Sequence, residues 1–566
     1  MGCQQPDQES ENSITPCPDQ SRTFLLKSPR GRSLLRMQDF TLSQAYIRFD
    51  AVIAAIEPRL RNSTPGVRGY DGSALSRRLS QRLVEVGLNP FVRQAADRHA
   101  RGLDPFSSQP STIDCSGLKF DIREGLVTPT FLRWARAVSE FSAQWLRTLL
   151  MVIWHAATAP RTAAGKASLL FGVGVEDLAA DGSDLRFVRF CRHGPIAPLR
   201  DAGRLIIECA TEIKSSQADR FRYSRHPLFS LDREFPPGIR ELLLFLVEHL
   251  AAAAAFFRAS TVLPIFCLLA RDLAIHALVS RLNRRGAIDS IVITNSNYHV
   301  QSLWMRALPG RRFRVHMVWY SQNSIPLVYR SNGVRSSVPN HRHIEVDEIW
   351  VWTAGFAGYL KETGVRGAVH VVGPIVWHLP ERGHAISEGD DPRLLVFDVT
   401  PTTLAFIQKL GLTPRLYFHR LENARKFICD ILEVRDELQR LLGRKVHAVL
   451  KHKRTPTPFH EHDYVTMVAR LADANLVDLV PPETNLYSLI GRSTLVLAIP
   501  YSSPVHIAAH MGVPAVYYDP TEELLPIYEA GENVYFASGR SQLQKVVSGL
   551  LRSRALTNRN QRAQNE

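Results

Sequence analysis

Closely spaced cysteine pairs and long uninterrupted apolar runs are both missing from this chain of 566 residues. The seven cysteines form no C-x-x-C pair and show no metal-ligand spacing, which favours free thiols in a reducing compartment. The two most apolar stretches, Trp145–Thr158 and Glu241–Ser280, are interrupted by polar or charged residues before they reach the roughly 20 apolar residues of a membrane-spanning helix. We therefore expect buried or interfacial helices in both places.

The best-known nucleotide-binding and metal-binding motifs are absent as well. The chain contains no G-x-x-x-x-G-K-[ST], and no G-x-G-x-x-G follows a predicted strand. Phe459–Asp463 holds two alternating histidines, but its spacing fixes no third ligand. The close acidic pair Asp390 and Asp391 lies in a predicted linker. We therefore expect no metal ion and no cofactor.

The positive charge of the chain is large but diffuse. The net charge is +15, and only 11 of the 69 basic residues are lysine. The arginines are scattered, without the basic patch and interleaved aromatic residues of a nucleic-acid site. This pattern argues against nucleic acid and favours anionic substrates or anionic lipid head groups.

A change in the pattern of apolar residues along the chain predicts two α/β domains behind a helical extension. From about residue 165, short apolar runs alternate with amphipathic helices, as in parallel sheets. A chain of this length also needs more than one core. The predicted parts are a disordered segment 1–40, a mostly helical extension 41–160, a first Rossmann-like domain 165–379, a linker 380–392, a second Rossmann-like domain 393–554 and a disordered tail 555–566.

One strand-to-helix turn in the second domain has the pattern of a phosphate site. Leu495–Ile499 is a continuous apolar run, typical of a buried parallel strand. Ser502 and Ser503 stand at the N-cap of the following helix, and Gly512 stands where that helix should end. The N-terminus of such a helix can hold a phosphate, although the same pattern also describes a plain capped helix.

Further polar residues follow other predicted strands. Lys451, His452 and Lys453 form a cationic cluster that suits a nucleotide diphosphate or phosphodiester, unless it is only a solvated charge run. Asp398 is placed to bond a ribose or an acceptor hydroxyl, or to cap the turn before Pro401. His299, in the first domain, is the best-placed candidate for proton transfer, with a simple loop histidine as the alternative.

Residues 165–550 resemble the GT-B glycosyltransferases, and within them the bacterial surface-polysaccharide biosynthesis proteins named for a Pro-Phe-Thr-Ser motif. Pro500–Ser503 is this chain's version of the motif. The supporting stretches are Thr294–Ser296, Trp319–Asn323, Val372–Pro374 and Gly512–Pro514. The resemblance implies two Rossmann-like parallel-sheet domains facing a cleft, with the donor nucleotide held by the second domain.

Two better understood groups share parts of this pattern. Bacterial sialyltransferases of this fold, which bind CMP-sugars, have a His-Pro motif and a downstream Ser-Ser/Thr motif. Ser502 and Ser503 match the second motif, while Lys451–Lys453 stands at the first but lacks the proline. CDP-glycerol transferases carry a similar Tyr-Ser-Ser before a helix. The departure weakens the assignment of cytidine and leaves the acceptor open.

The expected function is therefore a metal-independent glycosyltransferase of surface polysaccharide (capsule) biosynthesis. Its partners would be a nucleotide-sugar donor, a CMP-sugar among the candidates, and a glycan or lipid-linked acceptor. We expect a cytoplasmic protein, with peripheral contact at the inner face of the plasma membrane. The alternatives are a CDP-alcohol phosphotransferase of polymer synthesis and a non-catalytic GT-B-fold assembly or binding protein.

Overall fold

The structure of the chain is a computed structural model. It describes residues between 29 and 565. The segments outside the description are 1–28, 64–66, 68, 101–111, 116, 122–125, 159–165, 172–203, 209–220, 235–237, 295–300, 320, 322–327, 331–340, 375–390, 404–405, 407–418, 454, 483, 501, 527–532 and 566.

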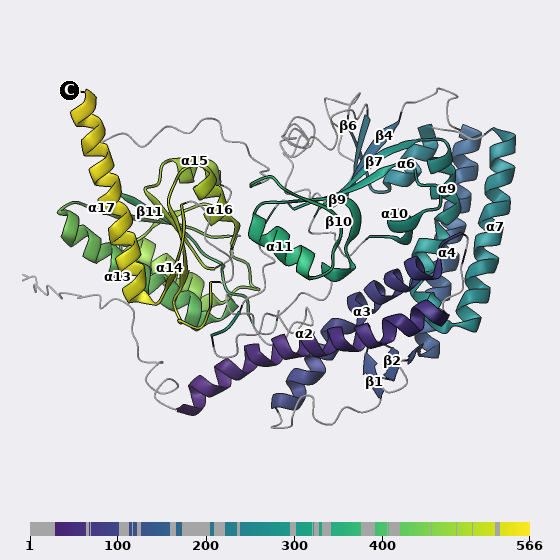
Figure 1. The fold of residues 1–566 in the computed structure, drawn as a ribbon, viewed down its shortest axis with the longest axis horizontal. Helices are drawn as coiled ribbons and strands as arrows, with labels where there is room; N and C mark the ends of the chain where they lie inside the picture. The colour runs from purple at the N-terminus through teal and green to yellow at the C-terminus, as the bar shows by residue number, and fades with distance from the viewer. Residues whose placement is uncertain are drawn as a thin grey trace, which may run out of the picture.

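The N-terminal extension packs two long helices on a small sheet. Helices α2 (Pro29–Ser63) and α3 (Gly72–Ala100) lie against each other beneath the first domain (Figure 1). Phe49 contacts Phe91 and Phe120 at ring distances of 5.2 and 6.2 Å, which joins both helices to the sheet. That antiparallel sheet, β1 (Thr112–Cys115), β2 (Leu118–Asp121) and β3 (Leu126–Pro129), was not expected in a mostly helical extension.

The first α/β domain is built on a seven-stranded, fully parallel sheet in the order β10-β9-β8-β7-β4-β5-β6. The strands are β4 (Ala167–Phe171), β5 (Arg204–Glu208), β6 (Phe221–Ser224), β7 (Ile288–Thr294), β8 (Arg314–Val318), β9 (Glu345–Val351) and β10 (Arg366–Val371). The described central strands are buried on both faces, as continuous apolar runs predict. Strand β6 was missed because the segment holds little apolar sequence.

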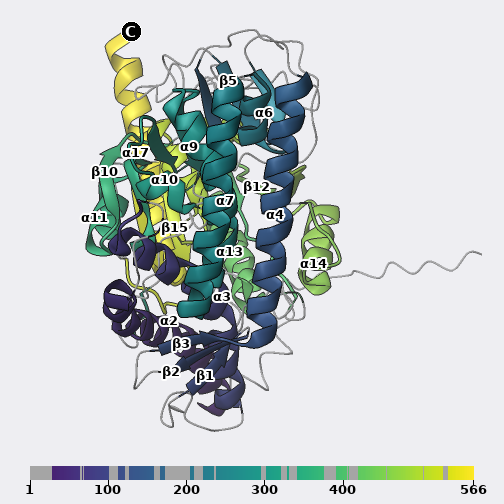
Figure 2. The ribbon, with the colours of Figure 1, turned by 90° about the vertical axis from the view of Figure 1, so that its right-hand side faces the viewer.

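A layer of helices covers one side of this domain. Helix α4 (Phe131–Thr158) comes from the extension and lies beside α7 (Ile239–Val262) at the outer end of the molecule (Figure 2). Both helices pack over a shorter inner layer. The remaining helices are α6 (Pro227–Glu234), η3 (Pro264–Leu269), α8 (Ala270–Ala274), α9 (His276–Arg284), α10 (Leu303–Ala307), η5 (His341–His343) and α11 (Ala354–Glu362).

The second α/β domain has a six-stranded parallel sheet in the order β13-β12-β11-β14-β15-β16. Its strands are β11 (Arg393–Phe397), β12 (His447–Lys451), β13 (Asp478–Val480), β14 (Leu495–Ala498), β15 (Ala515–Asp519) and β16 (Val534–Ser538). Its helices are α13 (Leu421–Leu442), α14 (His462–Asp473), α15 (Leu486–Gly491), α16 (Ser503–His510) and α17 (Arg540–Asn565). Each face of this sheet packs against its own apolar core. Successive residues of β11 and β14 belong alternately to one core and to the other.

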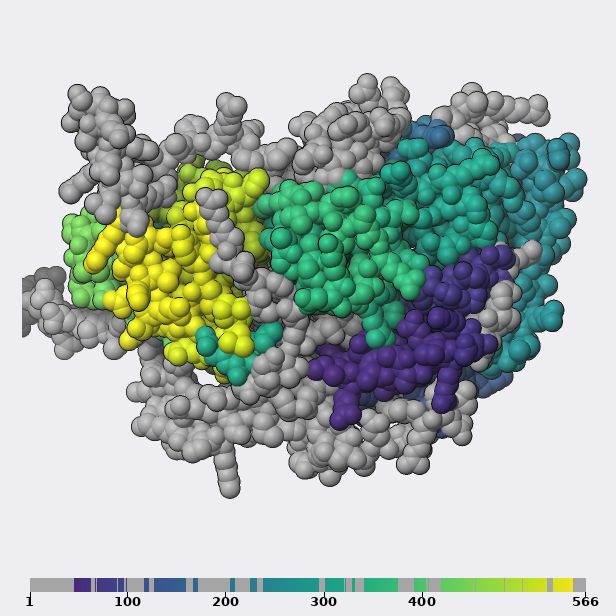
Figure 3. Space-filling model, in the orientation of Figure 1, coloured from purple at the N-terminus to yellow at the C-terminus, as the bar shows by residue number. Residues whose placement is uncertain are grey.

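The two domains are joined at a second place besides the chain connection. Residues 328–330, which follow β8, pair with residues 523–525, which follow β15, through N–H···O bonds of 2.8 and 2.9 Å. Tyr329 is buried in the core of the second domain. Figure 3 shows these teal atoms among the yellow atoms of that domain. A segment that follows β8 is therefore in direct contact with a segment that follows β15.

The prediction of two Rossmann-like parallel-sheet domains behind an N-terminal extension is confirmed, with corrections at the ends. Residues 29–40 belong to α2, and α17 continues to Asn565, so both segments expected to be disordered are helical where described. Most of the linker 380–392 lies outside the described residues. Cys267 is a free buried thiol, as expected, whereas Cys429 is disulfide-bonded, which was not expected.

Candidate functional site

The candidate site lies at the carboxyl edge of the second sheet. The last residue of β11, Phe397, pairs with Lys451 of β12 on one side and with Ala498 of β14 on the other. Three parallel strands thus end at one level, and the residues that follow them gather at one edge. Neighbouring strands lie about 4.8 Å apart, so the ends of β12 and β14 are separated by roughly 10 Å.

A buried carboxylate in the middle of this edge holds a histidine. Asp398 Oδ2 lies 2.6 Å from Nδ1 of His452 and accepts a hydrogen bond of 2.9 Å from the hydroxyl of Tyr464. Asp398 Oδ1 accepts the backbone N–H of Lys453 at 3.1 Å. Asp398 is 5% exposed and His452 is 4% exposed. Burial and the adjacent Asp398 carboxylate raise the pKa of Tyr464, which keeps its hydroxyl protonated as a donor.

This arrangement determines which nitrogen of His452 can act. With Nδ1 donating to the carboxylate, the ring is fixed in orientation and Nε2 is the nitrogen left for a ligand. No described residue lies within hydrogen-bonding distance of Nε2. A histidine backed by a buried carboxylate is an arrangement that serves proton transfer or hydrogen bonding to a phosphate. Asp398 is therefore placed to orient His452, rather than to reach a ribose directly.

The two lysines of the predicted cationic cluster have different surroundings. Lys451 is buried, and its Nζ donates to the backbone carbonyl of Pro482 and, at 3.5 Å, to that of His452. It therefore ties the end of β12 to the loop after β13. Lys453 is exposed. Of the two, Lys453 has its charge on the surface, where an anion can approach.

The predicted strand-to-helix turn is present, shifted by one position. Ser502 is the N-cap of α16, Ser503 is the first helical residue and Pro504 the second. No side chain caps the helix from the N-cap position, because Ser502 Oγ instead donates to Ile499 O at 2.9 Å. Gly512 has φ +75°, the left-handed conformation that ends helices, as predicted. The first turn of α16 therefore presents N–H groups without an intrahelical partner at the carboxyl edge.

An aromatic residue on the next strand fixes this turn. Tyr517 of β15 donates its hydroxyl to Ser502 O at 2.9 Å, and its ring meets His506 edge to face at 5.8 Å. Burial lowers the pKa of His506 to about 4, so this histidine is neutral at pH 7. The two side chains that support this turn, Tyr517 and His506, are neutral. The positive end of the helix dipole is therefore the main electrostatic feature of the turn.

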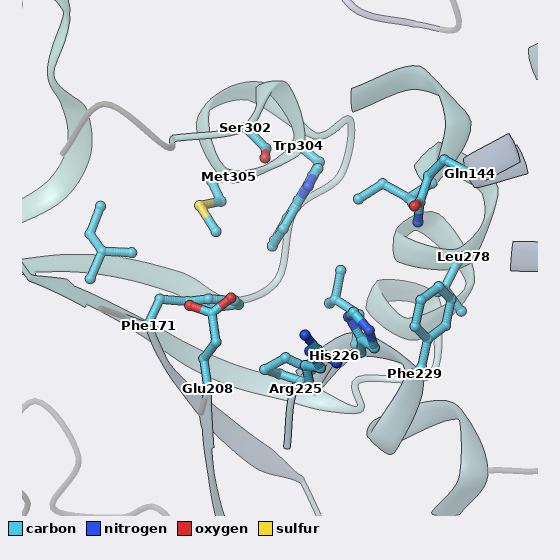
Figure 4. Close-up of a pocket in the computed structure, with 14 residues that line it drawn as sticks. Gln144, Phe171, Glu208, Arg225, His226, Phe229, Leu278, Ser302, Trp304 and Met305 are labelled. Atoms are coloured by element: carbon cyan, nitrogen blue, oxygen red, sulfur yellow. The ribbon is translucent and has the colours of Figure 1, made fainter. Parts of the chain in front are cut away.

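A cavity of about 210 Å³ lies at the carboxyl ends of β4, β5 and β7 in the first domain. Its lining is largely apolar, and Glu208, Arg225 and His226 supply the charged or ionisable groups. Figure 4 shows the Glu208 carboxylate and the His226 ring directed toward the same space. Burial, with Arg147 and Arg225 nearby, lowers the pKa of His226, so the ring is neutral and can accept a proton.

The structure separates the predicted residues into three groups. Asp398 and His452 are in contact, and Ser502 and Ser503 follow β14 on the same edge, one strand from Asp398 and two from His452. Lys451 faces into a loop. His299 lies outside the described residues.

Sequence reasoning missed Tyr464 and the cavity residues Glu208, Arg225 and His226. Tyr464 had no sequence signal, since it reaches Asp398 from another element. Near the cavity the sequence offered one indication of a site. His226 stands directly before Pro227, the first residue of helix α6.

No group of three metal-ligating side chains occurs among the described residues. In Phe459–Asp463, His460 Nδ1 instead accepts the Thr457 N–H at 2.9 Å, and Asp463 lies 3.4 Å from Arg425. These two side chains serve local structure.

Several solved structures share parts of this fold at low similarity. HepE of Anabaena, in complex with UDP and glucose, is 12% identical with a TM-score of 0.35 and covers 68% of this chain and 90% of its own. A glycosyltransferase of Rickettsia africae is 9% identical with a TM-score of 0.32, covering 69% and 89%. UDP-GlcNAc 2-epimerase of Methanocaldococcus jannaschii is 11% identical with a TM-score of 0.34, covering 68% and 92%. Likeness at this level is too distant to bear on what the chain binds.

No curated protein matches the chain in sequence. One family model does match, that of the polysaccharide biosynthesis PFTS motif proteins, over residues 252–547, which is just over half of the chain. The matched segment contains β7 to β16 and therefore the Asp398–His452 pair and the N-terminus of α16. The chain belongs to the family of polysaccharide biosynthesis PFTS motif proteins.

Proposed function

We propose that the protein is a glycosyltransferase of surface polysaccharide biosynthesis that uses a nucleotide-activated sugar. The observation that carries this proposal is the pairing of His452 with buried Asp398, two strands from the N-terminus of α16 on one sheet edge. Ligands of open parallel sheets bind at this edge. The donor phosphate would lie between the His452 ring and the first turn of α16.

Each group then has a role in the departure of the nucleotide. When the acceptor hydroxyl attacks the anomeric carbon, the bond from that carbon to the phosphate oxygen breaks, and negative charge grows on the phosphate. The N–H groups of α16 and the His452 ring would stabilise this charge. Asp398 holds the ring for that contact. The exposed Lys453 would add long-range attraction for the donor.

The acceptor would enter from the first domain. The cavity at β4, β5 and β7 offers an apolar surface with a carboxylate and a neutral imidazole, which suits a hydroxyl-bearing acceptor with an apolar part. His226 is the described candidate for removing the proton of the acceptor hydroxyl. His299 remains the candidate from the sequence.

A panel of nucleotides tests the donor site. A ligand present at about 100 times its Kd should add about 2.7 kcal/mol to the free energy of unfolding, which a thermal-shift assay detects. We expect one of CMP, CDP, UDP and GDP to raise the melting temperature of the wild type. His452→Ala should lose the shift. The matched control is His447→Ala, at the opposite end of the same strand β12.

Two other functions predict different results in the same protein. A CDP-alcohol phosphotransferase would bind cytidine nucleotides but would leave phosphorus in the acceptor, which phosphorus NMR of the product detects. A non-catalytic assembly protein would bind glycan and give no shift with any of the four nucleotides.

A further inference from the structure

Two outer helices of the molecule expose an unusually apolar surface. On α4, Leu132 and Trp154 are 79% and 64% exposed, and on α7, Ile239 and Val247 are 82% and 65% exposed. The other large apolar side chains exposed on the two helices are Phe131, Leu146, Leu150, Ile153, Leu243, Leu244, Leu250, Phe257 and Val262. Isolated exposed apolar residues are ordinary, but a continuous set of this size marks an interaction surface.

The two helices form one rigid layer. Phe141 of α4 stacks on Phe256 of α7 with ring centres 4.0 Å apart, and Trp145 stacks on His249 at 4.5 Å. Trp145 Nε1–H donates to the His249 carbonyl at 2.9 Å, and His249 Nε2 lies 2.9 Å from the Trp145 carbonyl. These contacts run in opposite directions along the two helices, so α4 and α7 are antiparallel.

The exposed apolar residues lie on one side of each helix. In α7 the buried residues include Phe245, Ala252 and Phe256, while the exposed positions recur three or four residues apart on the other side. The same periodicity holds for Leu132, Leu146, Leu150 and Ile153 of α4. Figure 2 shows the two helices side by side at the front of that view, so both stripes belong to one outer face, which we call the α4–α7 face.

The charges on the α4–α7 face are predominantly positive. Arg147, Arg240 and Arg258 are exposed on the two helices. Two of the three carboxylates on the helices are paired with arginine: Glu140 lies 3.3 Å from Arg136 and 3.5 Å from Arg271, and Glu248 lies 2.7 Å from Arg284. The third is Glu241, in the first turn of α7. Unpaired cationic groups therefore border an apolar surface, a combination that complements the anionic head groups and the acyl chains of a bilayer.

We propose that the α4–α7 face docks on an anionic membrane surface, with both helices lying in the interface plane. Apolar side chains such as Val247 would enter the acyl boundary, the exposed arginines would extend to the phosphates, and Trp154 would lie at head-group depth. Helix α7 is apolar and long enough to cross a bilayer by composition alone. Its inner side, however, packs on α4 through Phe256 and His249, which commits it to a flat orientation.

This placement has a consequence for the acceptor, which rests on the proposed function. Gln144 of α4 and Phe229 of α6 line the cavity of the first domain. Arg147, one turn from Gln144, has its guanidinium 5.7 Å from the Phe229 ring centre. The cavity thus lies directly beside the docked face, where a lipid-linked acceptor would be held at the membrane surface.

Vesicle sedimentation of the full chain tests the docking. We expect binding to vesicles of phosphatidylcholine mixed with an equal amount of phosphatidylglycerol, and much weaker binding to phosphatidylcholine alone. The variant Leu243→Glu/Val247→Glu/Leu250→Glu should weaken binding to the mixed vesicles by about tenfold or more. The variant Arg240→Gln/Arg258→Gln should lose the preference for anionic vesicles.

The matched control carries the same change at exposed apolar positions of the second domain, Leu441→Glu/Phe459→Glu/Leu479→Glu, and should bind vesicles like the wild type. A second readout is the fluorescence of Trp154, taken as the difference between wild type and Trp154→Phe. It should shift to shorter wavelength with anionic vesicles and be quenched by brominated lipid.

Four results would overturn the proposal. They are no binding to mixed vesicles, equal loss in both triple variants, resistance of bound protein to alkaline extraction, and a lipid-free dimer that the α7 variant abolishes. Extraction resistance would indicate a membrane-spanning α7, and the dimer would indicate that a second copy covers the face. The nucleotide shift of the α7 variant should remain, so failure of docking and failure of the donor site are distinguishable.

Discussion

At the scale of single residues, the proposed activity depends on how Asp398 orients the His452 ring. The carboxylate is buried and receives the His452 ring, the Tyr464 hydroxyl and the Lys453 N–H. Removing its charge while keeping its shape should allow the ring to rotate or change tautomer. Removing the Tyr464 hydroxyl should only delete one of several hydrogen bonds, a change worth about 1 kcal/mol of stability.

We therefore predict that Asp398→Asn lowers the rate of sugar transfer by about 10²-fold or more, because a mispositioned His452 ring no longer stabilises the charge that grows on the leaving phosphate. The nucleotide shift should be smaller in this variant than in the wild type, because the same ring contacts the bound phosphate. Tyr464→Phe is the control and should keep most of the rate. Equal rates for wild type and Asp398→Asn, measured with saturating donor, would show that the orientation of His452 by Asp398 does not contribute to transfer.

At the scale of elements, α3 is fastened to the first domain by buried charges. Arg78 of α3 lies 2.8 Å from Asp272 of α8 and 3.1 Å from Glu85. Asp272 also accepts the backbone N–H of Leu303 at 3.1 Å, at the start of α10, which lines the cavity. Burial and the neighbouring Arg78 lower the pKa of Arg306 to about 9. The cluster therefore holds several buried charges of both signs close together.

Asp272→Asn should therefore lower the free energy of unfolding by about 3–5 kcal/mol, since it leaves Arg78 charged, buried and without its main partner. Urea denaturation at pH 7 measures this change. The double variant Arg78→Met/Asp272→Leu should recover much of the loss, because it removes both charges. If the single variant were as stable as the wild type, the cluster would not hold the extension in place.

Sequence patterns predicted most of these elements, for a physical reason. Buried parallel strands are continuous apolar runs, and the predicted strand Leu495–Ile499 contains β14 (Leu495–Ala498). The small strands β1 to β3 and β6 have few apolar residues to mark them. The site was predicted as separate residues, because Asp398 and His452 are 54 positions apart and meet only through the register of β11 on β12.

At the scale of the whole molecule, buried histidines link stability to pH. Burial lowers the pKa of His341 to about 3 and that of His506 to about 4, while an unfolded histidine has a pKa near 6.5. Between pH 6.5 and 4 the unfolded chain binds protons that the folded protein does not. Stability is therefore complete above pH 6.5 and falls as the pH drops through this window.

The expected slope for two such histidines is roughly 2–3 kcal/mol per pH unit near pH 5. Urea denaturation at pH 7.5, 6 and 5 measures it. His506→Gln should reduce the slope by about 1 kcal/mol per pH unit, and His447→Gln, at the half-buried start of β12, is the matched control. A stability independent of pH between 7.5 and 5 would contradict the burial of these rings.

The two domains and the extension together place the proposed donor site and the cavity of the first domain on one molecule. The pairing of residues 328–330 with 523–525 holds a segment that follows β8 against a segment that follows β15, and so keeps the two domains together. Transfer requires this closeness, since the acceptor must reach the anomeric carbon of the donor. The central claim is that the His452 edge of the second domain holds the donor nucleotide.

Isothermal titration calorimetry tests that claim most directly, with the best nucleotide from the panel titrated into wild type, His452→Ala and His447→Ala. The account predicts equal affinity for wild type and His447→Ala, and affinity weaker by about tenfold or more for His452→Ala, which corresponds to at least about 1.4 kcal/mol. Equal affinity for all three proteins would contradict it.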